Sequence, residues 1–328
     1  MAPEACLASL DIVDCGAALA LARMGPALSP AGIRLRMQPV DRILFATDSV
    51  RVGAFRCPTD HPSFSDTGPI ENHLVVFPRT AVRIRHAGKP WFFADPTVVT
   101  IYNRGQEYRR TAESPDGDRC DWFGVAPDLA LAIARDLDPR VEDDPERPFR
   151  FAVAPSDPVL YFEQRALFQR LGNHTADPLE AEQTILEIVA RVLVRAYGAA
   201  ARRPRPPKAA ETHRELADRA RAALAREVAA RTDVTLLARQ LEVSPYHLCR
   251  VFRAQTGTTL HGYRLALRVH LALERLEEPG VELSQVAHDL GFVSHSHFTA
   301  VLRGRLGQVP SAVRRAVQGI RLGQRATA

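Results

Sequence analysis

The sequence has few cysteines, and those present are scattered. Five occur in 328 residues, at Cys6, Cys15, Cys57, Cys120 and Cys249, an odd number with no Cys-x-x-Cys pair. This distribution argues against a disulfide framework and against a structural zinc site. It is typical of a protein of the reducing cytoplasm.

Long apolar runs are also missing. No stretch of about 18 apolar residues occurs, so no membrane span is expected. The first 36 residues are rich in Ala, carry early acids at Glu4, Asp11 and Asp14, and lack the basic segment of a secretory signal. Met37 opens the first segment with clear patterning. We therefore expect the folded chain to begin near Met37, with residues 1–36 as disordered chain or an extension set by the choice of start site.

The common signatures of enzymes are absent. The sequence has no Gly-x-Ser-x-Gly, no phosphate-binding loop and no dinucleotide fingerprint. A metal-dependent β-barrel enzyme would need two close His on one strand, with a carboxylate and a third His nearby. His61, His73 and His86 are widely spaced, and residues 37–201 contain no His-x-His pair. The sequence thus favours a protein without catalytic residues, metal or cofactor.

The last third of the chain contains an internal repeat, in residues 237–257 and 286–307. Each copy has an apolar residue and an Ala, a Leu three positions after the Ala, a Ser after a turn, and a closing Gly. These residues are Leu237, Ala238, Leu241, Ser244 and Gly257 in the first copy, and Val286, Ala287, Leu290, Ser294 and Gly307 in the second. The repeat predicts two helix-turn-helix units in tandem, which can place two helices in successive major grooves on one face of DNA.

In the first copy, local signals define the second helix. Ser244 is a favourable N-cap and Pro245 a favourable first helical residue, and Gly257 is a favourable stop. The helix is therefore expected over residues 245–256. Its apolar side chains recur at helical spacing and should pack on the preceding helix; they are Leu248, Val251 and Phe252. The opposite face is polar, aromatic or cationic, and carries Tyr246, Cys249, Arg250 and Arg253.

The second copy repeats this pattern with one extra residue in the turn. Ser294 is the expected N-cap, and Phe298, Val301 and Leu302 should point inward. The outward set is His295, Ser296, Thr299, Ala300 and Arg303. Between the copies, residues 262–277 have apolar side chains at helical spacing. They predict a connecting helix that fixes the separation of the two units.

This arrangement resembles the DNA-binding domain of the AraC/XylS family of bacterial transcription regulators, over roughly residues 211–317. The most specific part is the second copy with its tail, which includes Ser296-His297-Phe298 and Pro310-Ser311. The resemblance implies that Tyr246, Cys249, Arg250, His295, Ser296, Thr299 and Ala300 face the groove. Ala300 departs from members that carry a basic residue there, so base recognition by the second unit should be weaker or depend more on DNA shape.

The predicted DNA-contacting set combines the resemblance with the polar faces of the two helices. It consists of Ser244, Tyr246, Cys249, Arg250, Arg253, His295, Ser296, Thr299 and Arg303. Arg250 is the strongest candidate for a base contact, because a guanidinium can make a bidentate contact to guanine. The matching residues His247 and His297 are expected to pack or to lie near phosphates.

Charge is distributed unevenly along the chain. Residues 209–328 hold 17 Arg and 11 acidic residues, a net charge of +6, and residues 202–208 add +4. Because the whole chain carries +5, residues 1–201 carry about −5. A basic end on a mildly acidic body suits a DNA-binding module joined to a different kind of domain.

The amino-terminal part has short apolar or alternating runs separated by turn signals. Strands are expected at residues 43–45, 51–56, 73–77, 81–86, 91–94, 98–102, 107–110 and 121–125. Many short strands at such spacing predict a small β-barrel or jelly roll. The segment is similar to the cupin-like sensor domain of the same family, most clearly over residues 73–79.

A small barrel can hold one ligand between apolar walls. Candidate ligand-lining residues are Trp91, Phe93, Tyr102 and Trp122, for which plain core packing is the simpler interpretation. Four arginines, Arg83, Arg85, Arg109 and Arg110, could meet an anionic ligand, although exposed strand faces explain them more simply.

Helices are expected after the barrel, over residues 127–136, 159–171 and 179–197. The last has a broad apolar stripe, which packs on the barrel, pairs with its copy in a dimer, or does both. Residues 202–208 are Arg- and Pro-rich and predict a semi-rigid linker. The expected fold class is α+β, with a cupin-like domain at 37–201, a linker at 202–210 and a DNA-binding domain at 211–328.

The sequence thus predicts a sequence-specific regulator of transcription that binds double-stranded DNA. A small-molecule effector or a homodimer through the barrel is expected to control it, and RNA polymerase is a candidate partner. Three alternatives stay open: a cupin-type metal enzyme with a DNA-binding appendage, a non-specific architectural DNA binder, and a dimeric regulator with no ligand.

Overall fold

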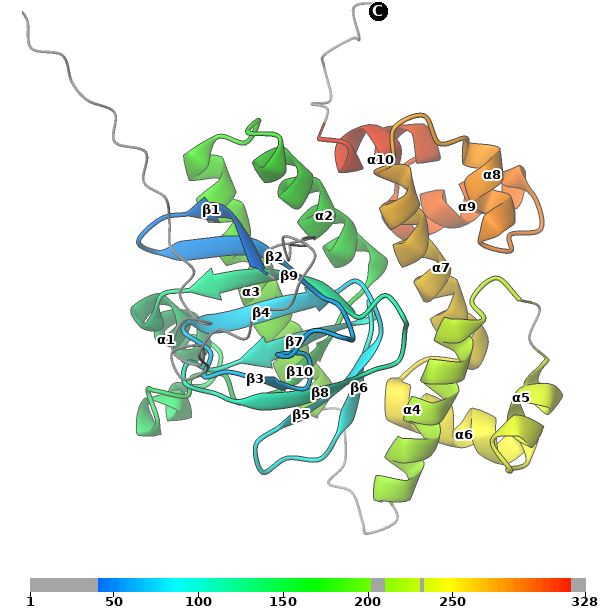
Figure 1. The fold of residues 1–328 in the computed structure, drawn as a ribbon, viewed down its shortest axis with the longest axis horizontal. Helices are drawn as coiled ribbons and strands as arrows, with labels where there is room; N and C mark the ends of the chain where they lie inside the picture. Colours follow the sequence, from blue (N-terminus) through cyan, green and yellow to red (C-terminus); the bar gives the residue numbers. More distant parts are fainter. Residues whose placement is uncertain (1–40, 202–209, 231–232, 320–328) are drawn as a thin grey trace, which may run out of the picture. The chain divides into compact units, whose positions relative to one another are not determined.

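A computed structural model of the protein describes residues 41–201, 210–230 and 233–319 (Figure 1). The predicted extension at 1–36 and the predicted linker segment 202–208 lie outside the described residues. Strands and three α-helices make up residues 41–201, and the rest of the described chain is helical, which confirms the α+β class. None of the described helices is long and apolar enough to cross a membrane.

The described strands pair antiparallel in two sheets. The first sheet has the order β1-β2-β9-β4-β7-β10 and the second β3-β8-β5-β6. The strands are β1 Asp41–Ala46, β2 Val50–Cys57, β3 Asp66–Thr67, β4 His73–Pro78, β5 Val82–His86, β6 Phe92–Ala94, β7 Val98–Tyr102, β8 Tyr108–Ala112, β9 Asp118–Val125 and β10 Val153–Pro155. The eight expected strands are all present. Only β3 and β10, of two and three residues, were not predicted. The pairing divides the strands between two sheets and does not close them into one ladder.

Side chains of the first sheet alternate between two apolar layers. In β4, Val75 and Phe77 join the large core formed with the helices, whereas Val76 joins a smaller cluster that also contains Tyr108 of the second sheet. In β9, Phe123 belongs to the first layer and Trp122 to the second. This is the period-2 alternation of a sheet buried on both faces.

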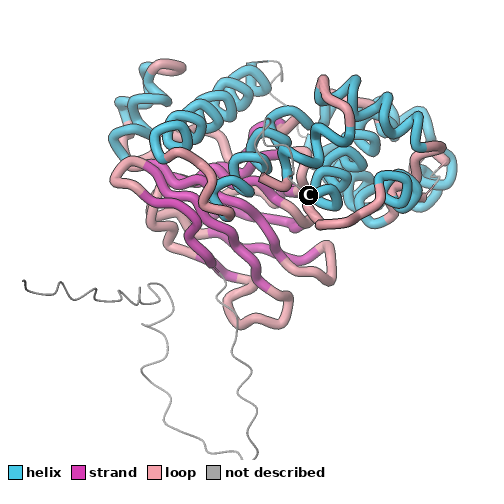
Figure 2. Tube along the Cα trace, turned by 90° about the horizontal axis from the view of Figure 1, so that it is seen from above, coloured by secondary structure: helices cyan, strands magenta, loops and turns pink. Residues whose placement is uncertain are grey.

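Helices cover one side of the strands, as Figure 2 shows. They are α1 Pro127–Arg135, the 3-10 helix η1 Pro139–Asp143, α2 Pro158–Gly172 and α3 Pro178–Ala201. The apolar stripe of α3 is buried in the large core, including Ile185, Val189 and Val192. The expected packing of the stripe on the strand-containing part is therefore confirmed, and its pairing with a second copy stays a prediction. Leu179 and Val194 remain 76% and 53% exposed.

The carboxyl-terminal helices form two units with α7 between them (Figure 1). The helices are α4 Ala210–Arg226, α5 Val234–Gln240, α6 Pro245–Thr256, α7 Leu260–Leu276, α8 Leu283–Asp289, α9 His295–Leu306 and α10 Pro310–Val317. The sequence pattern did not delimit α4 and α10, which flank the repeat. The predicted bounds of α6 agree with the structure, and α7 begins two residues earlier than expected.

The two units, α4 to α6 and α8 to α10, are attached in different ways to residues 41–201, which we call the sheet domain. Residues of the second unit, such as Val286, Phe298 and Leu302, belong to one continuous core with α2, α3 and the first sheet. The first unit has a core of its own, which includes Leu216, Leu237, Leu248 and Phe252. The second unit is therefore packed on the sheet domain, and the first unit is a more separate body.

Candidate nucleic-acid interface

The first helix-turn-helix consists of α5, a short turn and α6. Ser244 has extended backbone, and its hydroxyl accepts a hydrogen bond from the His247 N–H at 3.2 Å. The N-cap satisfies one amide that the helix leaves unpaired. Leu248, Val251 and Phe252 are buried against Leu237 and Ala238, as the spacing predicted. The sequence thus fixes both the start of α6 and the face that it buries.

The second unit, α8 with α9, repeats the first down to its hydrogen bonds. The Ser294 hydroxyl accepts from the His297 N–H at 3.1 Å. In the turns, the Val243 N–H donates to the Ala238 carbonyl at 3.0 Å, and the Phe292 N–H donates to the Ala287 carbonyl at 2.9 Å. The duplicated sequence therefore builds a duplicated local structure, with one extra residue, Val293, before the second cap.

The predicted DNA-contacting residues lie on the outward faces of α6 and α9. The exposed members are Ser244, Tyr246, Cys249, Arg250, Arg253, His295, Ser296 and Arg303, with Tyr246 78% exposed. Thr299 is half-buried and its hydroxyl oxygen is buried, so it is turned partly inward. Arg250 has one weak contact, to the His247 ring at 3.5 Å. Its guanidinium is therefore free to reach a base or a phosphate.

Known proteins match the chain in this region. The family described as a helix-turn-helix domain matches residues 237–316. The HTH-type transcriptional regulator GlxA of Rhizobium meliloti (strain 1021) is 32% identical over 83 residues, which cover 25% of this chain and 26% of GlxA. Regulatory protein SoxS of Escherichia coli (strain K12) is 32% identical over 82 residues, which cover 25% of this chain and 77% of SoxS.

The chain belongs to the AraC/XylS family. A solved AraC-type regulator from Chromobacterium violaceum is 23% identical, covering 33% of this chain and 97% of that protein, with a TM-score of 0.31. The chain spans between a quarter and a third of the length of the first curated relatives that it matches.

In this AraC/XylS chain, a polar cluster joins α7 to the sheet domain. The Arg79 Nε donates to both carboxylate oxygens of Glu274 at 2.8 Å, and the Tyr161 hydroxyl donates to Glu274 at 2.6 Å. Arg165 of α2 is fully buried between Glu277 of α7 and Asp121 of β9. Burial alone would raise the pKa of Glu274, but Arg79 and Arg165 lower it to about 2. The cluster therefore keeps Glu274 ionised and holds α7 on α2.

A second buried cluster connects the first unit to the sheet domain. Asp95, between β6 and β7, forms an ion pair with Arg221 of α4 at 3.1 Å and accepts a hydrogen bond from the Tyr263 hydroxyl of α7. Arg221 also donates to the Phe93 carbonyl at 2.9 Å. Burial and the Asp95 carboxylate raise the pKa of Tyr263, so its hydroxyl stays protonated and remains a donor.

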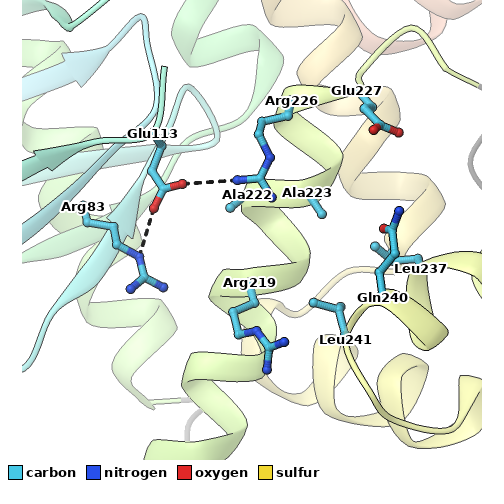
Figure 3. A pocket seen from close by; sticks show the side chains of 10 residues that line it. All are labelled: Arg83, Glu113, Arg219, Ala222, Ala223, Arg226, Glu227, Leu237, Gln240 and Leu241. Carbon is cyan, nitrogen blue, oxygen red and sulfur yellow. Dashed lines mark hydrogen bonds and ion pairs between the residues drawn. The ribbon is translucent and has the colours of Figure 1, made fainter. Parts of the chain in front are cut away.

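A groove of about 380 Å³ lies between the second sheet and the first helix-turn-helix unit (Figure 3). Glu113 sits between Arg83 at 3.2 Å and Arg226 at 3.5 Å. Arg219 also lines the groove, and no described residue pairs with it. Leu237 and Leu241 supply apolar surface. Glu227 of the turn after α4 lines the groove as well, so three arginines from the sheet domain and α4 face two glutamates there.

The structure does not gather the four aromatic residues predicted to line a ligand site. Tyr102 and Trp122 pack in the cluster between the sheets. Phe93 lies under the guanidinium of Arg221, with 4.9 Å between the guanidinium carbon and the ring centroid. Trp91 is half-buried under Arg85 at 5.0 Å. Each therefore has a packing partner, and they do not line one common cavity.

Among the four strand arginines, Arg110 departs from the simpler expectation of an exposed face. It is 1% exposed, ion-pairs with Asp118 at 2.8 Å and donates to the Phe64 carbonyl at 2.6 Å. Sequence alternation does not show which face of a two-layer fold is covered. Over the described part of the chain, no group of three His, Cys, Asp or Glu residues is placed to hold a metal ion.

Proposed function

We propose that this protein is a sequence-specific DNA-binding regulator of transcription that reads two half-sites with α6 and α9. The observation that supports this most directly is the pair of equally capped helices whose outward faces are exposed and polar. Arginines supply phosphate contacts and hence affinity, whereas groups at base edges supply discrimination. We infer that the chain acts as a regulator and not as an enzyme, since its curated relatives are named as regulators.

Selection of bound fragments from a random DNA pool by the purified full-length chain tests this proposal. We expect enrichment of a bipartite motif with half-sites about 10 bp apart, and affinity that falls steeply as salt rises. Equal recovery of all sequences would favour a non-specific architectural binder instead. Elemental analysis of the same preparation tests the enzyme alternative, which stoichiometric iron, zinc or manganese would support.

We also propose that a small anionic molecule controls the protein from the groove between the second sheet and α4. The groove joins cations of both parts, Arg83, Arg219 and Arg226, to an apolar wall. A ligand can act there only if it binds two arrangements of the parts with different affinity. One carboxylate of a ligand would pair with Arg219. A second carboxylate of the same ligand would pair with Arg226 and displace the long contact between Arg226 and Glu113.

Thermal unfolding in citrate, compared with sodium chloride of equal ionic strength, tests this effector site. Citrate should raise the midpoint of the wild type and have a smaller effect on Arg219→Ala. Arg109→Ala is the matched control, because Arg109 lies on the same sheet and pairs with Asp66 away from the groove. Equal citrate effects in all three proteins would argue against an effector at this groove.

A further inference from the structure

Arg268 of α7 is a buried cation paired with no described carboxylate. It is 8% exposed, and its partners are carbonyls that follow α4. Its Nε donates to Val228 at 2.9 Å, and its Nη2 donates to Ala229 at 3.3 Å and to Ala230 at 3.4 Å. These three residues lie in the turn that follows Arg226, the last residue of α4, and buried backbone carbonyls need a hydrogen-bond donor. Arg268 therefore fixes the turn after α4, in the first unit, to the connecting helix.

The same guanidinium also contacts the second unit. Its carbon lies 5.8 Å from the ring centroid of Phe292, in the turn between α8 and α9. Next to Phe292, Gly291 has a φ of 72°. A Cβ at position 291 would lie 2.2 Å from the Ala229 carbonyl oxygen and 2.9 Å from the Arg268 Nη2. The turn of the second unit thus contacts Ala229 in the turn that follows α4, and Arg268 lies beside this contact.

This contact matters because the two units do not share a core. The first unit packs in its own cluster, and the second is continuous with the sheet domain. Apart from α7, their relative placement depends on the few contacts that bridge them. A cation that binds three carbonyls of one unit and a ring of the other is suited to define that placement.

We propose that Arg268 and Gly291 form a clamp between the two helix-turn-helix units, and that this clamp sets the half-site spacing that the protein accepts on DNA. The inference rests on the proposed function. When two modules are held rigidly, binding of one half-site raises the effective concentration of the other module at the second half-site. A loosened clamp lowers that concentration and spreads it over more spacings.

Binding to DNA of varied spacing tests the clamp. The probe is the fragment selected by the wild-type chain, with 8 to 14 bp between half-site centres, together with a fragment that carries one half-site. We expect the wild type to prefer its selected spacing by about 10-fold or more over spacings changed by 2 bp. Arg268→Met should lose most of that preference and about 10-fold in peak affinity, with unchanged binding to the single half-site.

Two further variants separate the clamp from general stability. Arg264→Met is the matched control, because Arg264 lies one turn away and donates to Ala230 alone, at 3.0 Å. It should keep the wild-type spacing profile. Gly291→Ala perturbs the contact from the other unit, since the added Cβ meets a backbone carbonyl, and it should shift or flatten the profile. Unchanged profiles in both Arg268→Met and Gly291→Ala would overturn the proposal.

A measurement without DNA keeps the clamp testable if no sequence is selected. Spin labels are placed on the exposed native Cys249 of α6 and on Ser296→Cys of α9, with Cys6 and Cys15 replaced by Ser and with Cys57 and Cys120 buried. Pulsed electron resonance should give a narrow distance distribution for the wild type and a broader one for Arg268→Met and Gly291→Ala. Equally narrow distributions would overturn the clamp, whereas failure to select any DNA would overturn only the proposed function.

If Arg268→Met does not fold, Gly291→Ala and Arg268→Lys decide the question by the same two measurements.

Discussion

Polar residues at α6 and α9 differ in whether their side chains already form hydrogen bonds within the protein. Ser244 and Ser294 are exposed but already accept a hydrogen bond within their helices, so they position the helix. Arg250 is exposed and only weakly engaged, so its hydrogen-bonding capacity is available to a partner. The most informative substitution for DNA recognition is therefore at Arg250.

Replacing Arg250 by Ala should weaken binding to the selected DNA by about 1–3 kcal/mol and relax the preference at one base position. Fluorescence anisotropy with the selected fragment and with single-base variants measures both effects. Arg239→Ala, on the first helix of the same unit, is a matched loss of charge outside the predicted set. If Arg250→Ala and Arg239→Ala behave alike, α6 does not present Arg250 to a base.

His270 of α7 is the residue whose titration should be visible in the stability of the protein. It is fully buried and packs edge-on against Tyr161 of α2, with 4.6 Å between ring centroids. Burial lowers the pKa of His270 to about 4. Below pH 6.5 the His270 side chain is protonated in the unfolded chain but stays neutral in the folded protein. The contribution of His270 to the free energy of unfolding is therefore complete above pH 6.5 and is lost as the pH falls toward 4.

Between pH 8 and pH 5, His270 should cost the wild type about 2 kcal/mol of folding free energy. His270→Phe should lack that part of the loss, which urea unfolding at both pH values measures. His86 has a pKa lowered by burial to about 4 as well and remains in both proteins, so their difference isolates His270. The same pH dependence in wild type and variant would mean that His270 is hydrated in solution.

At the scale of elements, the two turns solve one geometry with different residues. Glu242 has a φ of 60° and Gly291, at the matching position, a φ of 72°. A left-handed backbone costs a non-glycine residue about 1–2 kcal/mol. Gly291 avoids this conformational cost. A side chain at position 291 would also collide with the Ala229 carbonyl. At position 242 there is no such collision, because the side chain is exposed.

Glu242→Gly should therefore stabilise the first unit by about 0.5–1 kcal/mol, after the extra entropy that glycine gives the unfolded chain is taken into account. Glu242→Ala, which removes the same side chain but keeps the backbone cost, should give no gain. Hydrogen exchange of the α5 and α6 amides measures both. Equal protection in the two variants would show that the turn is unstrained.

Elements defined by local signals could be predicted from the sequence, and those defined by distant contacts could not. Ser244 and Gly257 define the two ends of α6, and these signals lie in or next to the helix itself. The alternation of apolar residues in β4 likewise indicates a strand without further context. By contrast, α4 depends on contacts with residues far along the chain, such as Asp95 with Arg221. For the same reason, sequence spacing did not indicate Glu274, whose partners Arg79 and Tyr161 are remote in the sequence.

At the scale of the whole molecule, the sheet domain and the second unit share one core and the first unit has another, and α7 contributes Leu273 to the former and Leu267 to the latter. A structural change in the sheet domain therefore acts on the second unit through continuous apolar packing. It acts on the first unit through fewer contacts, which are the Asp95 cluster, the Glu113–Arg226 pair in the groove and Arg268. Because cores unfold cooperatively, the two units should differ in local stability.

Hydrogen exchange over the full chain should show this difference, with α5 and α6 amides exchanging faster than those of α8 and α9. Arg165→Met should then raise exchange in α7 to α10, because it removes the buried cation between Asp121 and Glu277 and leaves the two carboxylates only longer ionic contacts, to Arg79. Breaking a buried ion pair costs up to about 3–5 kcal/mol. Arg170→Met is the control on the same helix, since Arg170 pairs with Glu180 at the surface. Equal effects of the two substitutions would mean that the buried Arg165 ion pairs do not hold the second unit in place. Uniform exchange across both units would mean that the protein unfolds as one body. The groove and the clamp could not then shift one unit without the other, and effector control would have to act on the fold as a whole.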